Sequence, residues 1–279
     1  MVDFWRYELM PKRRLSAIAD AGPRRGALIR VNGGYADVHP WPELGDLPLD
    51  EQLALLARGK TTPLTSSSLE FASIDAAARR DGRSLFDGLT IPPSHWPGPD
   101  PPPAFDTVKL KSIDVIPDRV RLRIDFNATL TAEEFVDIAA TLPRERIDFV
   151  GDPCPYDAST WRELRTKTGL RLALDRAPSS SQDSFDVLIV KPALEEIPCN
   201  DAEIVVTSYM DHPIGQLCAA YSAATANITS TCGLITHVLF ENDPFIERMR
   251  IDGTRLVPPD GSGWGFDDLL EKLPWQELC

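Results

Sequence analysis

The feature that most restricts the fold of this chain is a series of short apolar runs, each closed by polar residues and followed by a helical pattern. The runs span residues 120–124, 147–150, 170–174 and 186–190, and the polar residues that close them are Asp125, Asn127, Asp152, Asp175 and Lys191. Strands that alternate with helices build a parallel sheet. Charges at the ends of successive buried strands are costly unless they meet a metal, a substrate or each other. The pattern therefore predicts a (β/α) barrel with its site at the carboxyl ends of the strands.

Two lysines open this series before the first apolar run. Lys109 and Lys111 are two residues apart, and strand alternation places both on the same face. Lys191 closes a later strand that would lie on the opposite side of the barrel. A desolvated lysine near a divalent cation has a lowered pKa and can act as a base at neutral pH. Asp125 and Asp175 are hard oxygen ligands of the kind that Mg²⁺ prefers.

Each of these charged residues, taken alone, is more often an ordinary strand end that is paired in a salt bridge. The ordered set K-x-K, D-x-N, D-P, L-D and V-K-P favours a common site, because strand alternation must place every member correctly. His95, His212 and His237 lack ligand spacing with any cysteine or acid, and we expect them to be ordinary histidines.

The remaining sequence predicts a second, smaller domain. Residues 4–10 and 26–31 form antiparallel strands, and residues 49–57 and 67–80 form helices, with Thr65 and Ser66 as caps. Residues 91–103 are crowded with proline and form a loop at the domain junction. We expect an α+β domain over 1–95 and a barrel over 96–239, with barrel helices at 131–141, 158–168 and 213–226. The tail, 240–279, is expected to pack on the first domain.

Charge and cysteine usage narrow the class of protein. The chain has 29 basic and 42 acidic residues, a net charge of −13, which argues against a nucleic-acid or anionic-membrane binder. A small anionic or metal-bound substrate remains compatible with this balance. The five cysteines show no CxxC spacing and are expected to be reduced thiols. With neither an apolar signal core nor a span-length apolar stretch, the sequence predicts a cytoplasmic protein.

The ordered set of barrel residues resembles the enolase superfamily, and within it the o-succinylbenzoate synthase branch of menaquinone biosynthesis. The resemblance extends over most of the chain. Residues 34–42 resemble the flexible capping-domain loop of that family, and residues 68–78 resemble its capping helix. Residues 207–215 and residues 233–236 resemble its substrate-binding turns.

This resemblance implies an α+β capping domain on a (β/α)₇β barrel of the TIM type. It implies a Mg²⁺-assisted syn dehydration of 2-succinyl-6-hydroxy-2,4-cyclohexadiene-1-carboxylate to 2-succinylbenzoate. Lys111 would be the base, Lys191 the opposing cation and Lys109 the residue that tunes Lys111. By the same resemblance, Asp125 and Asp175 would be metal ligands, with Asp152 as the candidate for the third ligand. The substrate-binding residues would be Arg123, Asn127, Thr207, Ser208 and Gly233.

One position departs from the family pattern, which has a metal-binding glutamate where this chain has Gly151. Asp152 can replace it only if the strand end twists, because its side chain should otherwise point away from the lumen. Two alternatives therefore stay open beside the synthase. One is an N-acylamino-acid racemase of the same superfamily, since two opposed lysines suit one base per face. The other is a metal-deficient, non-catalytic member. A dipeptide epimerase is disfavoured, because residues 208–212 lack the D-x-D signature.

Overall fold

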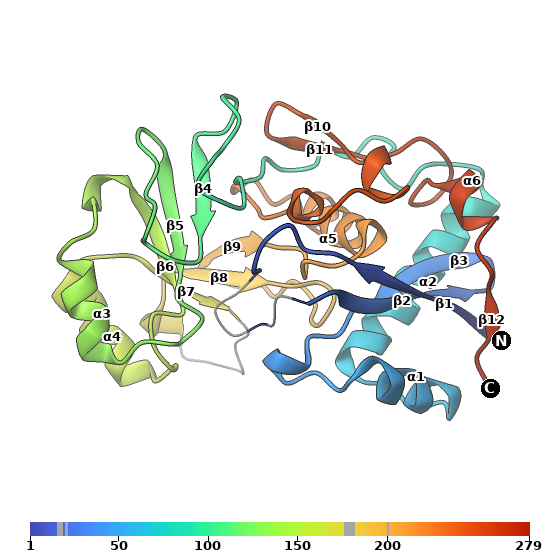
Figure 1. Ribbon diagram of the computed structural model, residues 1–279, viewed down its shortest axis with the longest axis horizontal. Coiled ribbons are helices and arrows are strands. Elements are labelled where there is room, and N and C mark those ends of the chain that lie inside the picture. Colours follow the sequence, from blue (N-terminus) through green and yellow to red (C-terminus); the bar gives the residue numbers. More distant parts are fainter. Residues whose placement is uncertain (16–18, 20–21, 176–181, 200) are drawn as a thin grey trace.

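The computed structural model describes residues 1–15, 19, 22–175, 182–199 and 201–279 (Figure 1). Its N-terminal part is an antiparallel sheet in the order β12-β1-β2-β3. The four strands are β1 (Val2–Leu9), β2 (Arg24–Val31), β3 (Gly34–Val38) and β12 (Gln276–Glu277). The C-terminal strand β12 pairs with β1, so the end of the chain completes the N-terminal sheet. The exact domain boundaries stay a prediction.

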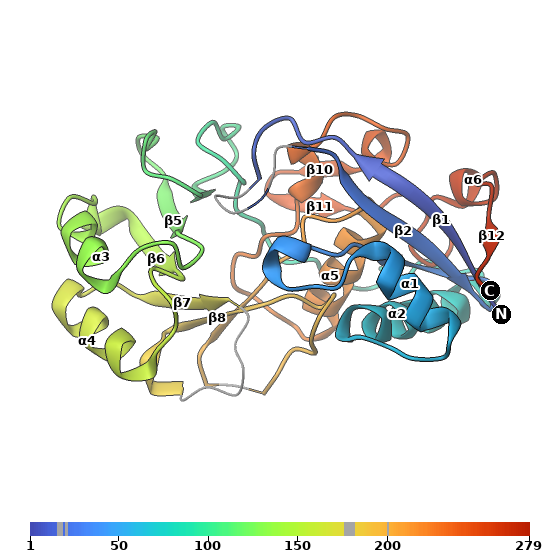
Figure 2. The same ribbon diagram turned by 60° about the horizontal axis from the view of Figure 1, so that its bottom comes forward.

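Two helices cover one face of this sheet, α1 (Leu49–Ala57) and α2 (Pro63–Arg80), and Figure 2 shows them on the same side. Both belong to a cluster of buried side chains with Ala27, Ile29, Ala36 and Val38 of the sheet. The sequence predicted that the second helix begins at residue 67, whereas α2 begins at Pro63. Thr62 is the N-cap and forms a reciprocal capping box with Thr65, and Pro63 follows at the first helical position.

The barrel consists of a parallel sheet in the order β4-β5-β6-β7-β8-β9. Its strands are β4 (Thr107–Leu110), β5 (Arg121–Asp125), β6 (Ile147–Gly151), β7 (Leu172–Asp175), β8 (Val187–Val190) and β9 (Glu203–Val206). Three parallel bridges continue it beyond its edges, Thr207 with Gly233, Ser94 with Cys232, and Trp96 with Val108. These bridges join β9 back to β4 through residues 94–96 and 232–233. The predicted barrel with a capping domain is confirmed.

The helices on the outside of the barrel are few. The described helices of this part are α3 (Ala132–Ala139), α4 (Ala158–Thr168) and α5 (Pro213–Thr225). In Figure 1, α3 and α4 lie beside each other and α5 lies on the side of the capping sheet. The C-terminal part adds the hairpin of β10 (Arg250–Asp252) and β11 (Arg255–Val257), and the short helix α6 (Asp267–Leu270). No helix among the described residues is long and apolar enough to cross a membrane.

Strand alternation divides the apolar side chains of the barrel into two clusters. Phe149, Ala173, Val187, Ile189 and Val205 form the interior cluster. The neighbouring positions on the same strands, such as Val150, Leu188 and Val190, pack outward in the cluster that contains α3 and α4. This inward and outward order carries on past the strand ends and places Lys191 inside the barrel, two residues beyond Ile189.

A pair of buried acids lies where β3 meets the segment before α5. Asp37 accepts a hydrogen bond of 2.7 Å from the Tyr7 hydroxyl, and Asp211 is 2% exposed. A Cβ atom on Gly215 would lie 2.6 Å from Asp211 Oδ2 and 2.7 Å from Asp37 Oδ2, so both carboxylates crowd one point. Burial raises the pKa of Asp211 to about 7. Burial and the charge of Asp211 hold the pKa of Asp37 well above its usual range.

Candidate active site

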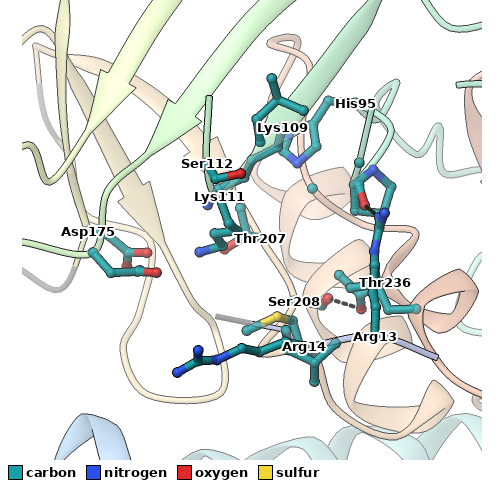
Figure 3. A pocket seen from close by; sticks show the side chains of 18 of the residues that line it. Arg13, Arg14, His95, Lys109, Lys111, Ser112, Asp175, Thr207, Ser208 and Thr236 are labelled. Atoms are coloured by element: carbon teal, nitrogen blue, oxygen red, sulfur yellow. Dashed lines mark hydrogen bonds between the residues drawn. The ribbon is translucent and has the colours of Figure 1, made fainter. Parts of the chain in front are cut away.

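A cavity of about 650 Å³ lies between the carboxyl ends of the barrel strands and the chain segment that follows β1 (Figure 3). The barrel residues of the predicted set that line it are Lys109, Lys111, Asn127, Asp152, Asp175, Lys191, Thr207, Ser208 and Gly233. They come from separate strand ends, which meet at one edge because the sheet is parallel. The tertiary structure therefore brings together residues that are more than 120 positions apart in the sequence.

Lys109 and Lys111 project from the end of β4 onto a single carboxylate. Lys109 Nζ lies 2.9 Å and Lys111 Nζ 2.6 Å from Asp125 Oδ2. The other oxygen of Asp125 accepts hydrogen bonds from the backbone and side-chain nitrogens of Asn127, at 3.0 and 3.2 Å. Asp125 is 2% exposed and lies beneath the two lysines. The aspartate thus anchors both ammonium groups at the floor of the cavity.

The environments of these two lysines differ although they share a partner. Burial, together with the charge of Lys109, holds the pKa of Lys111 below its usual range despite the nearby Asp125 carboxylate. Burial also acts to lower the pKa of Lys109, but Asp125 and Asp175 outweigh it and raise that pKa. Burial acts to raise the pKa of Asp125, yet the two lysines hold it well below its usual range. Lys111 is therefore the lysine that loses its proton more easily.

Lys191 occupies the opposite wall. It follows β8, which is four strands from β4 in the sheet order. Its ammonium group forms an ion pair with Asp175 at the end of β7. Lys191 is 7% exposed, so its charge is held close to the cavity rather than in bulk solvent. The cavity accordingly has a cationic group on each of two facing walls.

Asp152 lines the cavity even though alternation along β6 points its side chain outward. Gly151 has the interior position, where a Cβ would lie 3.6 Å from Asp125 Cγ. Asp152 adopts a φ of +38°, and this local twist turns its carboxylate toward Asp175, whose backbone N–H donates to Asp152 Oδ1 at 3.1 Å. Burial raises the pKa of Asp152 well above its usual range, and the carboxylates of Asp175 and Asp125 raise it further.

A polar wall follows β9. Thr207 and Ser208 are buried, and the Ser208 and Thr236 hydroxyls form a hydrogen bond of 2.6 Å. Gly233 lies where the next segment pairs with Thr207. A Cβ on Gly233 would lie 2.9 Å from both Thr207 Cγ2 and His95 Cε1, so glycine is needed for this close approach. These residues supply hydroxyl and backbone groups to the cavity lining.

Arg123 does not line the cavity, contrary to the expectation that it contacts substrate. It is 2% exposed, and its Nε donates to Asp148 Oδ2 at 2.8 Å. Its guanidinium also donates to the Thr231 carbonyl at 2.6 Å and lies over the Phe149 ring. Because Arg123 lies two positions before Asp125 on β5, it faces the same lumen but at a deeper level. Its contacts are with other buried groups of the barrel interior.

His95 was not predicted as a site residue, yet it lines the cavity and contacts Arg123 in the deeper part of the barrel interior. Its Nδ1 lies 3.1 Å from an Arg123 nitrogen. Burial, followed by the charges of Arg123, Lys109 and Lys111, holds the pKa of His95 well below its usual range. His95 is therefore neutral at neutral pH. No motif marked it, because the proline-rich segment that carries it becomes part of the barrel only through tertiary pairing.

The expectation for residues 34–42 is wrong. Gly34–Val38 forms β3 of the capping sheet, and residues 34–41 are all buried, so this segment packs inside the protein rather than forming a loop over the cavity. The capping residues that line the cavity are instead Arg13, Arg14, Leu15 and Leu44. The sequence signal for this segment was the tract 11–15, which carries three consecutive basic residues after a strand.

Comparison with known proteins agrees with this architecture. The family model for the N-terminal domain of o-succinylbenzoate synthase matches residues 2–78. An o-succinylbenzoate synthase of Bdellovibrio bacteriovorus is 33% identical over 319 aligned residues, which cover 98% of this chain and 97% of the relative. The chain belongs to the o-succinylbenzoate synthase family. The predicted resemblance is confirmed, and the capping domain of this family member includes the segment of Arg13 and Arg14.

Solved structures share the fold of this family member. A dipeptide epimerase from Cytophaga hutchinsonii, complexed with Mg and D-Ala-L-Val, superposes with a TM-score of 0.75 at 16% identity and covers 99% of this chain and 98% of its own. The L-Ala-D/L-Glu epimerase from Bacillus subtilis has a TM-score of 0.73 at 14% identity, with coverages of 95% and 97%. At these identities the likeness concerns the fold alone.

The donor set of this family member fits a hard divalent cation. Asp125, Asp152 and Asp175 supply only carboxylate oxygens, and the pKa of Asp152 is raised by burial and by the other two carboxylates. A cation placed among them would remove that repulsion. Within the described residues no group of three potential ligands is already gathered around one point. Lys109 and Lys111 hold Asp125 and Lys191 holds Asp175, so metal binding requires these ion pairs to rearrange.

Proposed function

We propose that the chain is an o-succinylbenzoate synthase of menaquinone biosynthesis. It would dehydrate 2-succinyl-6-hydroxy-2,4-cyclohexadiene-1-carboxylate to 2-succinylbenzoate. The observation that carries this proposal is the pair of lysines, Lys111 and Lys191, on facing walls of one cavity in a chain of this family. Two cationic groups on facing walls suit a reaction in which a proton leaves a carbon beside a carboxylate and negative charge develops on that carboxylate.

Lys111 would remove the proton from the ring carbon that bears the carboxylate. The C–H electron pair passes into the carboxylate as an enediolate, then returns to form the ring double bond as the C–O bond of the neighbouring hydroxyl breaks. In a syn elimination the hydroxyl leaves from the face that Lys111 occupies, so the same ammonium group can return the proton and release water. Lys191 would stabilise the enediolate electrostatically from the other face.

The other barrel residues would bind and orient the substrate. Lys109 stays charged beside Lys111 and can contact the ring carboxylate. Thr207, Ser208 and Gly233 offer hydroxyl and backbone groups on the wall behind the substrate, and Asn127 holds Asp125 in place. Asp125, Asp152 and Asp175 would hold Mg²⁺. When bound, the metal would supply a positive charge that further stabilises the enediolate oxygens.

The test is dehydration of the proposed substrate by the purified chain, followed in the ultraviolet as the aromatic product forms, with Mg²⁺ and then with excess EDTA. Turnover that stops on addition of EDTA and returns with Mg²⁺ supports the proposal. A folded chain that shows no turnover at saturating Mg²⁺ contradicts it. Circular dichroism of the same sample distinguishes an inactive fold from an unfolded one.

The runner-up function is racemisation of an N-acylamino acid. The same observation favours it, because two lysines on facing walls can act as one base per face. Incubation of N-succinyl-L-amino acids in D₂O, read by polarimetry and by loss of the Cα proton signal, separates the two reactions. Exchange and racemisation faster than dehydration would reverse the ranking. A chain that performs neither reaction would be the non-catalytic member that Gly151 suggests.

A further inference from the structure

The cavity has a basic wall on the side of the capping domain that the proposed chemistry does not use. Arg13 and Arg14 follow β1 and line the same cavity as the three lysines. Figure 3 shows Arg14 extending below Lys111 and Asp175, while Arg13 runs in a different direction. A cation at this position is separate from the strand ends where the reaction would occur, so it can contact a remote part of a ligand.

The backbone that carries Arg14 is fixed on both sides. Before it, the Arg13 guanidinium donates a hydrogen bond to the Pro97 carbonyl and packs against Gly98, which attaches the segment to the chain just before β4. After it, Leu15 is 5% exposed and belongs to the core cluster that the capping and barrel parts share. Arg14 Nε donates to the Ala19 carbonyl at 3.1 Å, which orients the guanidinium.

The charge balance of the cavity favours an anion. Five Lys and Arg side chains line it, against the lining carboxylates of Asp114, Asp152 and Asp175 and the carboxylate of Asp125 beneath Lys109 and Lys111. This excess of positive charge is found in a chain whose net charge is −13. The three lysines surround the strand ends, where one carboxylate of a substrate would react. Arg14 stands apart from them, and guanidinium groups bind carboxylates through paired, charge-assisted hydrogen bonds.

We propose that Arg14 binds the second carboxylate of a dicarboxylate substrate, at the end remote from the reacting carbon, and that it sets the preference for dicarboxylates. This inference rests on the proposed function, which supplies a substrate with one ring carboxylate and one succinyl carboxylate. Arg13 is a positioning residue that attaches the segment to the barrel. The proposal concerns recognition, so it applies to binding as well as to turnover.

The test compares two ligands that differ in the remote carboxylate. Calorimetry measures binding of 2-succinylbenzoate and of 2-butyrylbenzoate, in which a methyl group replaces that carboxylate, to the wild-type chain and to R14Q. We expect R14Q to weaken 2-succinylbenzoate binding by about 10- to 100-fold and to leave 2-butyrylbenzoate binding within about twofold. R25Q, which removes an exposed arginine paired with Glu8, is the matched control and should change neither affinity.

Two results would overturn the inference. One is equal weakening of both ligands by R14Q, which would indicate a general effect on the cavity. The other is a wild-type chain that binds 2-succinylbenzoate no more tightly than 2-butyrylbenzoate, or that binds neither. Failure of the proposed function gives a different result. The chain would then bind 2-succinylbenzoate through Arg14, with the expected loss in R14Q, but would not dehydrate the precursor.

Discussion

Replacement of Asp211 by asparagine should change how the stability of this protein depends on pH. Asp211 and Asp37 face each other between the capping sheet and α5, and no ion pair of either carboxylate is found among the described residues. The groups that surround them are Tyr7, His39, His212 and Cys218. Burial, with the charge of Arg24, lowers the pKa of His39 to about 3, and burial holds the pKa of His212 well below its usual range, so neither histidine supplies positive charge near neutral pH.

The size of the effect follows from the two pKa values of Asp211, 3.8 in its ordinary state and about 7 in the folded protein. Because the folded pKa is raised, the folded state binds this proton more tightly than the unfolded state does. The stabilisation is fully present below pH 3.8 and is lost as the pH rises through 7. The shift corresponds to about 4 kcal/mol in total, of which about 3 kcal/mol is lost between pH 5 and pH 8.

Urea unfolding of the wild-type chain and of D211N at pH 5 and pH 8 measures this difference. The asparagine side chain does not ionise, so D211N should be more stable relative to the wild type at pH 8 than at pH 5, by about 3 kcal/mol. D252N, in which an exposed aspartate of β10 is replaced, is the control and should leave the pH dependence unchanged. A stability difference between D211N and the wild type that is the same at both pH values would refute the reasoning.

The remaining predictions concern the cavity. K111A should lower the rate of dehydration by about 100- to 10,000-fold, because it removes the base. Calorimetry should show that K111A still binds 2-succinylbenzoate, and the exposed-site control K60A should stay active. A K111A rate close to that of the wild type would rule out Lys111 as the base. G151E should tighten Mg²⁺ binding by at least about tenfold in calorimetry, because a Cβ at this position has room beside Asp125. The control G151A adds a Cβ without a ligand atom and should not tighten binding. Equal Mg²⁺ affinities for the two variants would mean that position 151 does not face the metal. D152N should weaken Mg²⁺ binding by about tenfold or more, since it removes one of three carboxylates, and an unchanged affinity would leave Asp125 and Asp175 as the protein ligands.

Much of the secondary structure could be predicted because it depends on local patterns. Helices α1 and α4 begin and end where the apolar periodicity and the flanking residues place them, and β5 to β8 follow the short apolar runs. Lys109, Lys111 and Lys191 could be placed in one site from strand alternation, since parallel strands end at the same edge. The position of the Asp152 side chain was harder to predict, because strand alternation points it away from the lumen. Its backbone at φ +38° provides the twist that turns it into the cavity.

Other parts of the site could not be predicted, because they depend on contacts between segments far apart in the chain. His95 reaches the cavity only when residues 94–96 pair with Val108 and Cys232, and no local pattern marks a strand of that length. Arg123 faces the same side of β5 as Asp125, and contacts with Asp148 and the Thr231 carbonyl hold its guanidinium at a deeper level. Residues 34–42 were expected to form a loop over the cavity, but residues 34–38 form β3 and every one of them is buried.

The sequence by itself determined the class of fold and which polar residues end the barrel strands, because hydrophobic periodicity fixes which strand positions face inward. The tertiary structure decided which cations share a carboxylate, how Asp152 turns toward the lumen, and that Arg14 rather than residues 34–42 covers the cavity. These features depend on distances between segments and on the burial of charge, and both arise only after the capping sheet and the barrel have packed together.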